Sequence, residues 1–234
     1  VMQLYSMLKL TSFQTNLTVD IAPLFETISD LKNASKVMEQ LYINSTYRSH
    51  LTSRKNKQTI MLGFSDGTKD GGYLMANYSI FKAKEELTKI SRKYNVEVIF
   101  FDGRGGPPAR GGGKTHQFYA SLGPTIEDKE IQLTIQGQTI SSNFGTKDSS
   151  KFNIEQLISS GISNKLNYFN KNIKNIDLAI LENIANVSYN AYDKFKNHPK
   201  FISYLENIST LKYYNKANIG SRPSKRNNSN KLIF

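Results

Sequence analysis

Residues 60–104 read IMLGFSDGTKDGGYLMANYSIFKAKEELTKISRKYNVEVIFFDGR, and the fold prediction rests on this stretch. Two short apolar runs, Ile60–Phe64 and Val96–Phe101, enclose a segment in which apolar residues recur every third or fourth position from Tyr73 to Tyr94. Continuous apolar runs are typical of strands in a parallel sheet, and the intervening spacing is typical of a helix with one apolar face. The stretch therefore predicts a strand, a covering helix and a second strand.

The same order of elements extends to both sides of this stretch. Upstream, Val19–Phe25 predicts a strand, and the apolar positions from Ile28 to Leu41 predict a helix after it. Downstream, Ile131–Ile140 alternates apolar and polar residues and predicts a further strand. From Phe152 onward the spacing is helical. We therefore expect an α/β protein with many helices.

A charged residue follows each of the first three predicted strands: Glu26, Asp66 and Arg104. They lie about 40 residues apart, which fits one strand, one helix and their connections, so we expect consecutive βα units. In α/β sheets and barrels the carboxyl ends of the strands carry the functional site. We predict that these residues border one site. Residues 1–150 then form the βα units, and 151–234 form a helical continuation of the same domain with a basic loop.

The composition restricts the partners of this chain. Its 234 residues include 31 Lys and Arg against 19 Asp and Glu, a formal net charge of +12, and no Cys. This charge favours anionic partners, whether nucleic acid, acidic membranes or phosphorylated and carboxylated small molecules, without choosing among them. The absence of Cys excludes disulfides, thiolate zinc sites and a Cys nucleophile, and it indicates a reducing compartment. No run of about 18 apolar residues predicts a membrane span.

The stretch 103–116, GRGGPPARGGGKTH, follows directly after a predicted strand. Glycines allow backbone N–H groups to approach an anion, and Arg104 and Arg110 supply forked donors, so the stretch predicts a cradle for an oxyanion. A surface loop without function is the alternative. The GKT at 113–115 resembles the end of a P-loop, but Pro108 stands where that motif needs its first glycine. Proline has no N–H, which disfavours a nucleotide site.

Two carboxylates at neighbouring strand ends form a second candidate site. Glu26 and Asp66 would offer two hard oxygen ligands, and Mg²⁺ or Mn²⁺ typically takes only one or two protein carboxylates. Lys69 would stabilise negative charge near such an ion. The alternatives are structural: Asp66 and Asp70 could cap a helix, and Glu26 could begin one, where the helix dipole favours a carboxylate.

Together these motifs resemble the phosphoenolpyruvate carboxylase family. The resemblance rests on APLFET at 22–27, GFSDGTKD at 63–70, DGRGGPPARGGG at 102–113, QG at 136–137 and GSRPSKR at 220–226, in the family's order. It covers essentially the whole chain. Because the family's subunits are several times longer, the resemblance implies an internal catalytic segment. It also implies part of an elaborated (β/α)8 TIM-type barrel, a cytoplasmic location and a homotetramer for the full-length enzyme.

The resemblance implies a carboxy-lyase reaction that feeds the tricarboxylic acid cycle. Phosphoenolpyruvate and bicarbonate give oxaloacetate and inorganic phosphate, with Mg²⁺ or Mn²⁺ as cofactor. In the family, bicarbonate attacks the phosphoryl group, and the resulting carboxyphosphate releases CO₂, which the pyruvate enolate captures. No membrane or nucleic-acid partner is expected. The isolated segment is expected to be inactive, because the family's catalytic histidine lies in an N-terminal part that this sequence does not include.

Residue by residue, the resemblance implies metal ligands at Glu26 and Asp66, catalytic roles for Lys69 and Arg110, and substrate-binding arginines at Arg104 and Arg222. Many members of the family have His where this chain has Asp102, so the role of that histidine is not carried over. Two other hypotheses stay open at this point. One is a phosphate- or RNA-binding module that uses the Gly/Arg-rich loop, and the other is a fragment that neither folds nor binds.

Overall fold

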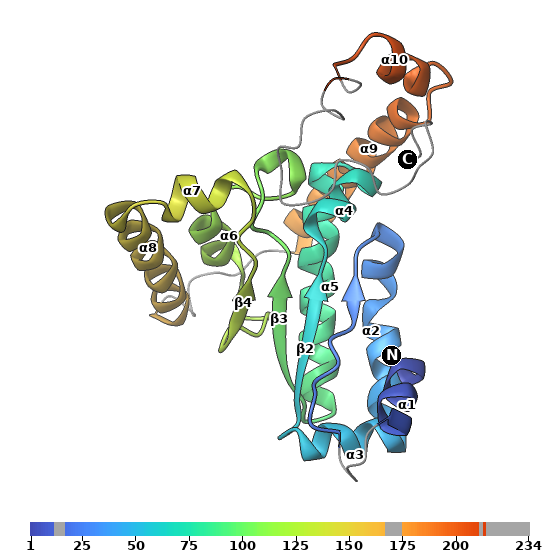
Figure 1. Ribbon diagram of the computed structural model, residues 1–234, viewed down its shortest axis with the longest axis vertical. Helices are drawn as coiled ribbons and strands as arrows, with labels where there is room; N and C mark the ends of the chain where they lie inside the picture. The colour runs from blue at the N-terminus through green and yellow to red at the C-terminus, as the bar shows by residue number, and fades with distance from the viewer. Residues whose placement is uncertain (12–16, 167–174, 211–212, 214–234) are drawn as a thin grey trace.

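The computed structural model describes residues 1–11, 17–166, 175–210 and 213, and a parallel sheet lies at their centre (Figure 1). The strands are β1 (Leu24–Phe25), β2 (Lys57–Leu62), β3 (Glu97–Asp102) and β4 (Ile131–Leu133). Their spatial order, β1-β2-β3-β4, is the order along the chain. All three pairings are parallel. Each strand therefore reaches the next by a crossover that returns the chain to the same end of the sheet.

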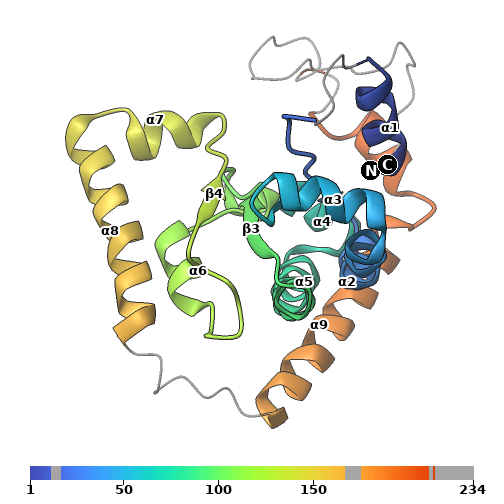
Figure 2. The same ribbon diagram turned by 90° about the horizontal axis from the view of Figure 1, so that it is seen from below.

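Helices form these crossovers and most of the remaining chain. Those between strands are α2 (Ile28–Ile43), α3 (Ser45–Ser53), α4 (Phe64–Gly71), α5 (Tyr73–Lys93), the 3₁₀ turn η1 (Pro108–Arg110) and α6 (Thr115–Ser121). The others are α1 (Met2–Thr11), α7 (Gln138–Phe144), α8 (Lys147–Leu166), α9 (Asn175–Lys196) and α10 (Phe201–Asn207). Helices α2 and α5 lie side by side on one face of the sheet (Figure 2). The predicted α/β class is confirmed for this part of the chain.

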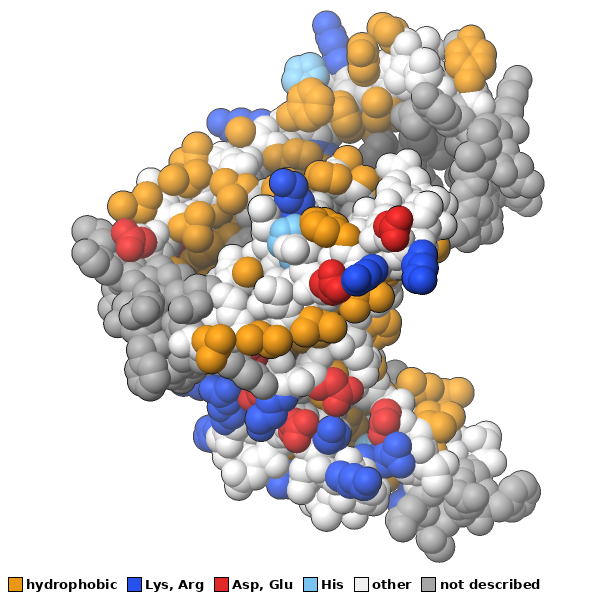
Figure 3. Space-filling model, turned by 90° about the vertical axis from the view of Figure 1, so that its left-hand side faces the viewer, with side chains coloured by type: hydrophobic (Ala, Val, Ile, Leu, Met, Phe, Trp, Pro, Cys, Tyr) orange, Lys and Arg blue, Asp and Glu red, His pale blue; other side chains and the backbone are white. Residues whose placement is uncertain are grey.

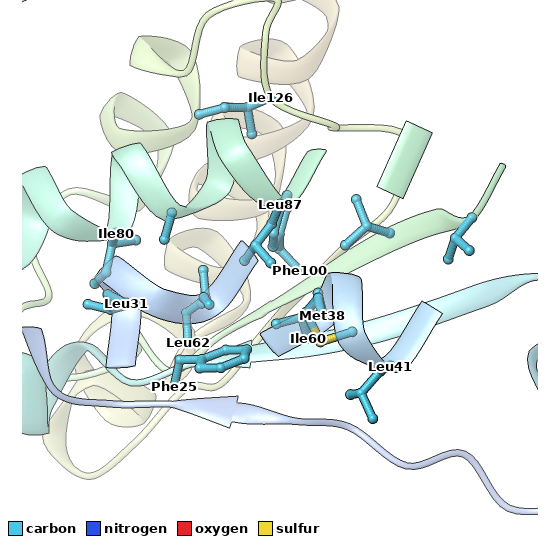
Figure 4. Packing of buried hydrophobic residues seen from close by; sticks show 14 of the residues in the cluster. Phe25, Leu31, Met38, Leu41, Ile60, Leu62, Ile80, Leu87, Phe100 and Ile126 are labelled. Carbon is cyan, nitrogen blue, oxygen red and sulfur yellow. The ribbon is translucent and has the colours of Figure 1, made fainter. Parts of the chain in front are cut away.

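The main core lies between that face of the sheet and the two helices (Figure 4). Ile60 and Phe100 project from neighbouring strands toward Met38 of α2 and Leu87 of α5, and all four are buried. The helical spacing read from the sequence places Met38 and Leu87 on the buried stripes of their helices. Burying side chains of this size stabilises a fold by roughly 1.5–3 kcal/mol each.

Three boundaries differ from the prediction. The strand predicted at Val19–Phe25 is only the two residues of β1, and the one predicted at Ile131–Ile140 ends at Leu133. Gly137 has a φ of +55° and begins α7, which turns the chain out of the strand direction. Residues 64–71 form helix α4, which the spacing of apolar residues did not predict.

The faces of the structure are not equally covered. On the side of the sheet away from α2 and α5, Thr59, Met61 and Phe101 are half-buried. Helix α8 exposes apolar side chains, namely Phe152, Ile154, Ile158, Ile162 and Leu166. Hydrophobic side chains spread over the middle of the face on the side of α7 and α8, whereas charged ones gather at its lower end (Figure 3). Among the described helices, none has the length and apolar character that crossing a bilayer requires.

Candidate active site

The two predicted carboxylate ligands lie against each other at the carboxyl ends of β1 and β2. Glu26 directly follows β1, Asp66 lies in the first turn of α4, and a side-chain hydrogen bond joins them. Burial, together with the adjacent charge of Asp66, raises the pKa of Glu26. Lys69, one turn further along α4, places its Nζ 2.7 Å from Oδ1 of Asp66. The structure therefore brings together three of the predicted site residues.

A glycine makes this close approach possible. Gly63 lies between β2 and α4, and a Cβ there would stand 2.7 Å from Cγ of Glu26 and 3.1 Å from its Cα. Gly67 of α4 likewise lies against the backbone oxygen of Glu26, at 3.1 Å from an added Cβ. A glycine lowers the intrinsic stability of a helix by about 1 kcal/mol. The close packing against Glu26 gives a physical reason why α4 nevertheless contains Gly67.

Contacts from distant segments fix the carboxyl end of α4. Oδ2 of Asp70 accepts a hydrogen bond from the backbone N–H of Ile28 at 2.8 Å, at the start of α2. From α9, Oη of Tyr192 donates to the carbonyl of Lys69 at 2.8 Å, and Nζ of Lys196 donates to that of Asp70 at 2.8 Å. These carbonyls belong to the last turn of a helix, where acceptors lack intrahelical partners. Nothing in the local sequence predicted the two α9 residues, which lie more than 120 positions away along the chain.

The glycine-rich loop packs on the opposite side of α4. Gly111, at a φ of +79°, lies so close to the carbonyl of Phe64 that an added Cβ would stand 2.7 Å from it. Gly105 is equally restricted, because a Cβ there would overlap the carbonyl oxygen of Thr134. Nε of Arg110 donates to Oγ of Ser65 at 3.1 Å. The loop is thus fitted to its surroundings, and it brings Arg110 beside the helix that carries Asp66.

Arg104 lies within this loop and is only 4% exposed. Its Nη2 donates to the carbonyl of Gly112 at 3.3 Å and its Nη1 to that of Gly113 at 3.4 Å, while Cζ stands 4.4 Å from the ring centroid of Phe118. Burial lowers its pKa from the ordinary arginine value. Nε has no hydrogen-bond partner within the described structure. None of the hydrogen bonds identified for Arg104 reaches Glu26 or Asp66. Arg104 is connected to this carboxylate pair through the glycine-rich loop and α4.

The comparison with known proteins decides the family. From residue 1 to residue 233 the sequence matches the family model described as phosphoenolpyruvate carboxylase. This chain belongs to the phosphoenolpyruvate carboxylase family. A curated relative, "Phosphoenolpyruvate carboxylase" of Nitrosomonas eutropha, is 36% identical over 220 residues, which cover 92% of this chain and 23% of the relative. The chain thus spans about a quarter of the length of the curated relative it matches.

This member of the family also contains a buried ion pair that the sequence analysis did not predict. Asp102 shares the orientation of Phe100 along β3, so its carboxylate faces α5 and lies 2.6 Å from Nζ of Lys84. Tyr119 donates to the same oxygen of Asp102 at 2.7 Å. The sequence held one signal for this pair: Lys84 interrupts the apolar stripe of α5 between Ile80 and Leu87. A lysine on a buried stripe calls for a carboxylate partner.

The donors present fit a hard divalent ion. The described residues contain no group of three or more His, Asp or Glu side chains that could hold a metal. The pair of Glu26 and Asp66 is a set that Mg²⁺ or Mn²⁺ accepts, with other oxygens completing the coordination. Burial and the adjacent charge of Asp66 raise the pKa of Glu26, so its ionised form is disfavoured, and a bound cation would offset that cost. Asp102 is committed to Lys84, and Arg222 lies outside the described residues.

Proposed function

We propose that this chain supplies part of the active site of a phosphoenolpyruvate carboxylase. The complete enzyme would join phosphoenolpyruvate and bicarbonate to give oxaloacetate and inorganic phosphate. The observation that carries this proposal is the arrangement around α4, with the pair of Glu26 and Asp66 beside Lys69 on one side and the arginine-bearing glycine loop on the other. Family membership supports the choice of reaction.

Glu26 and Asp66 would hold the Mg²⁺ or Mn²⁺ ion through their carboxylate oxygens. When bound, such an ion supplies a Lewis acid that stabilises negative charge on substrate oxygens. Lys69, at 2.7 Å from Asp66, holds a positive charge at the edge of this pair. We assign it to steadying anionic species formed during the reaction.

The arginines would bind the anionic parts of the substrate. A guanidinium offers donors in a fixed fork that matches phosphate and carboxylate oxygens. Arg104 is held in place by the carbonyls of Gly112 and Gly113 and by the ring of Phe118, which leaves Nε as an unused donor within the described structure. We assign Arg104 to the substrate phosphate and Arg110, on the outer part of the loop, to the carboxylation step. Arg222 stays a proposed substrate residue on sequence grounds alone.

We further propose that the four strands are part of a closed barrel. A doubly wound sheet reverses its strand order at a switch point, whereas a (β/α)8 barrel adds strands in chain order, as β1 to β4 do. The half-buried Met61 and Phe101 would then line the barrel interior, and the exposed apolar side chains of α8 would meet further parts of the assembly. A cytoplasmic homotetramer, inactive as the isolated segment, completes the proposal.

A nucleic-acid module is a weaker hypothesis. Family membership favours the carboxylation reaction over such a module. Binding of this kind would weaken steeply with salt and survive Glu26→Gln, since counterion release does not involve that carboxylate.

The test is bicarbonate-dependent phosphate release by the complete carboxylase that carries this segment. We expect Asp66→Asn and Lys69→Ala to lose most of the activity, on the order of 100-fold or more for groups at the reacting centre. Lys93→Ala is the matched control, because Lys93 is 61% exposed and pairs with Glu39 at 2.7 Å, much as Lys69 is 64% exposed and pairs with Asp66. Equal activity in all these variants would overturn the proposal.

A further inference from the structure

Two buried cations share one aromatic ring at the carboxyl end of β3. Nζ of Lys84 stands 5.3 Å from the ring centroid of Phe118, and Cζ of Arg104 stands 4.4 Å from it. Lys84 is 1% exposed and Arg104 4%. Between these elements Asp102, with no exposed surface, contributes one carboxylate. Two buried positive groups and one buried negative group thus lie close together.

This carboxylate has two cations within electrostatic reach and is bonded to only one. Oδ2 of Asp102 accepts from Nζ of Lys84 at 2.6 Å and from Oη of Tyr119 at 2.7 Å, while its Oδ1 has no partner within the described structure. Arg104 interacts with the charge of Asp102, yet its hydrogen bonds go to the loop carbonyls and to Tyr73. Burial raises the pKa of Tyr119 above its ordinary value, so this phenol stays a neutral donor.

The distribution of charge follows from this arrangement. A buried ion needs a partner of opposite sign, because removal from water costs several kcal/mol per ion. Lys84 supplies that partner to Asp102, and the pair is neutral as a unit. The positive charge of Arg104 is therefore not offset by a carboxylate bonded to it. Without Lys84, Asp102 would still interact with the charge of Arg104.

We propose that Lys84 is a positioning residue for Arg104: by holding Asp102, it keeps this carboxylate from pairing with the arginine and leaves the guanidinium free to bind an anionic substrate. This inference rests on the proposed function, because it takes the anionic substrate to be phosphoenolpyruvate. It assigns to α5, on the outer side of the sheet, a role in substrate affinity that acts through Asp102. Lys84 itself touches neither the substrate nor the metal ligands.

The experiment measures kcat and the KM for phosphoenolpyruvate in the complete carboxylase, with Mg²⁺ saturating. In Lys84→Gln, we expect KM to rise about tenfold or more, the effect of losing one charge-assisted hydrogen bond, with a smaller change in kcat. The double variant Lys84→Gln with Asp102→Asn removes both charges, and its KM should return to within about threefold of the wild-type value. Lys82→Gln is the control, since Lys82 lies on the same helix and pairs with Glu85 at 2.7 Å, away from the loop.

The readouts separate this inference from simple loss of stability and from the proposed function. A merely structural lysine would lower the melting temperature without changing KM in the folded enzyme, and that result overturns the inference, as does a double variant whose KM stays high. If Lys84→Gln does not fold, KM is measured instead in Lys84→Arg and in the double variant. A wild-type KM in both variants supports the inference, and a tenfold rise of KM in either variant overturns it. If the wild type does not carboxylate, the proposed function fails, while calorimetric titration of the same variants with phosphoenolpyruvate still tests Lys84.

Discussion

The substitution Gly63→Ala tests the packing around Glu26, on which the proposed metal site depends. Gly63 has a φ of −89°, which alanine adopts without strain, so any cost must come from the contact of the new Cβ with Glu26. That Cβ would stand 2.7 Å from Cγ and 3.1 Å from both Cα and Cβ of Glu26, against an ordinary contact of 3.4–4 Å. Cγ must therefore move by at least about 0.7 Å, the shortfall between 2.7 and 3.4 Å, or the backbone must shift instead.

The magnitude follows from that displacement. Overpacking of one methyl costs about 1–3 kcal/mol, and the reduced flexibility of the unfolded chain returns about 0.4–1 kcal/mol. A net loss of about 1–2 kcal/mol would lower the melting temperature by about 2–8 °C in a chain of this size. In the proposed carboxylase, a ligand displaced by close to 1 Å would reduce kcat by up to about 100-fold.

The assay combines thermal melts with titration of Mn²⁺ into the purified protein. Gly123→Ala is the matched control, since its new Cβ would have no neighbour within 4 Å. We expect Gly63→Ala to melt at lower temperature and to bind Mn²⁺ more weakly than this control. The reasoning is refuted if the two variants melt alike and bind Mn²⁺ with the same affinity, because Glu26 would then have room that the structure does not show.

Three further predictions concern the same site. Because the folded-state pKa of Glu26 is raised, its ionisation costs stability as pH rises from 4.5 through that raised value. In the absence of metal, Glu26→Gln should therefore melt at a higher temperature than the wild type at pH 7 and lose this advantage below pH 4.5. Added Mn²⁺ should not raise the melting temperature of Glu26→Gln. Tyr192→Phe removes the donor to the carbonyl of Lys69 and should cost about 1 kcal/mol in chemical denaturation, whereas Tyr204→Phe, at a 53% exposed position, should cost nothing measurable. Asp70→Asn replaces the charged acceptor at the first backbone N–H of α2 and should cost about 0.5–1 kcal/mol in the same measurement, an expectation that an unchanged unfolding midpoint contradicts.

Local patterns in the sequence predicted the parallel strands and their covering helices, because each depends on neighbours within about 20 residues. The apolar runs placed β2 and β3 to within three residues, and the helical spacing placed α2 and α5. The short helix α4 was missed, because its two glycines disfavour a helix and it has no apolar spacing of its own. In the structure Glu26 packs against Gly67 and Ile28 packs against Gly71. Such contacts between segments about 40 residues apart leave no periodic signal.

The carboxylate pair of the candidate site could be predicted from the sequence, whereas the position of its arginine could not. Placing Glu26 and Asp66 at neighbouring strand ends required only the topology, which predicts that parallel strands end at one edge. Where Arg104 rests could not be predicted, because its position depends on loop carbonyls and on the ring of Phe118. The interrupted apolar stripe of α5 indicates that Lys84 has a partner, but not that the partner is Asp102, because the pair is a tertiary contact between a helix and the next strand.

The charges of the proposed site residues give a physical reason for placing the carboxylates and the arginines in one site. Glu26 and Asp66 contribute two negative charges, while Lys69, Arg104 and Arg110 contribute three positive ones, which leaves a single positive charge. A divalent ion on the carboxylates raises this to three, close to the charge of a substrate that carries one carboxylate and a phosphate of about −1.5 to −2. The two carboxylates therefore repel the anion before the ion binds; once the ion neutralises them, the three cationic side chains attract the anion without that opposition. In the proposed carboxylase, the charge of the metal ion is therefore enough to make substrate affinity depend on the metal, in addition to any direct coordination of the substrate.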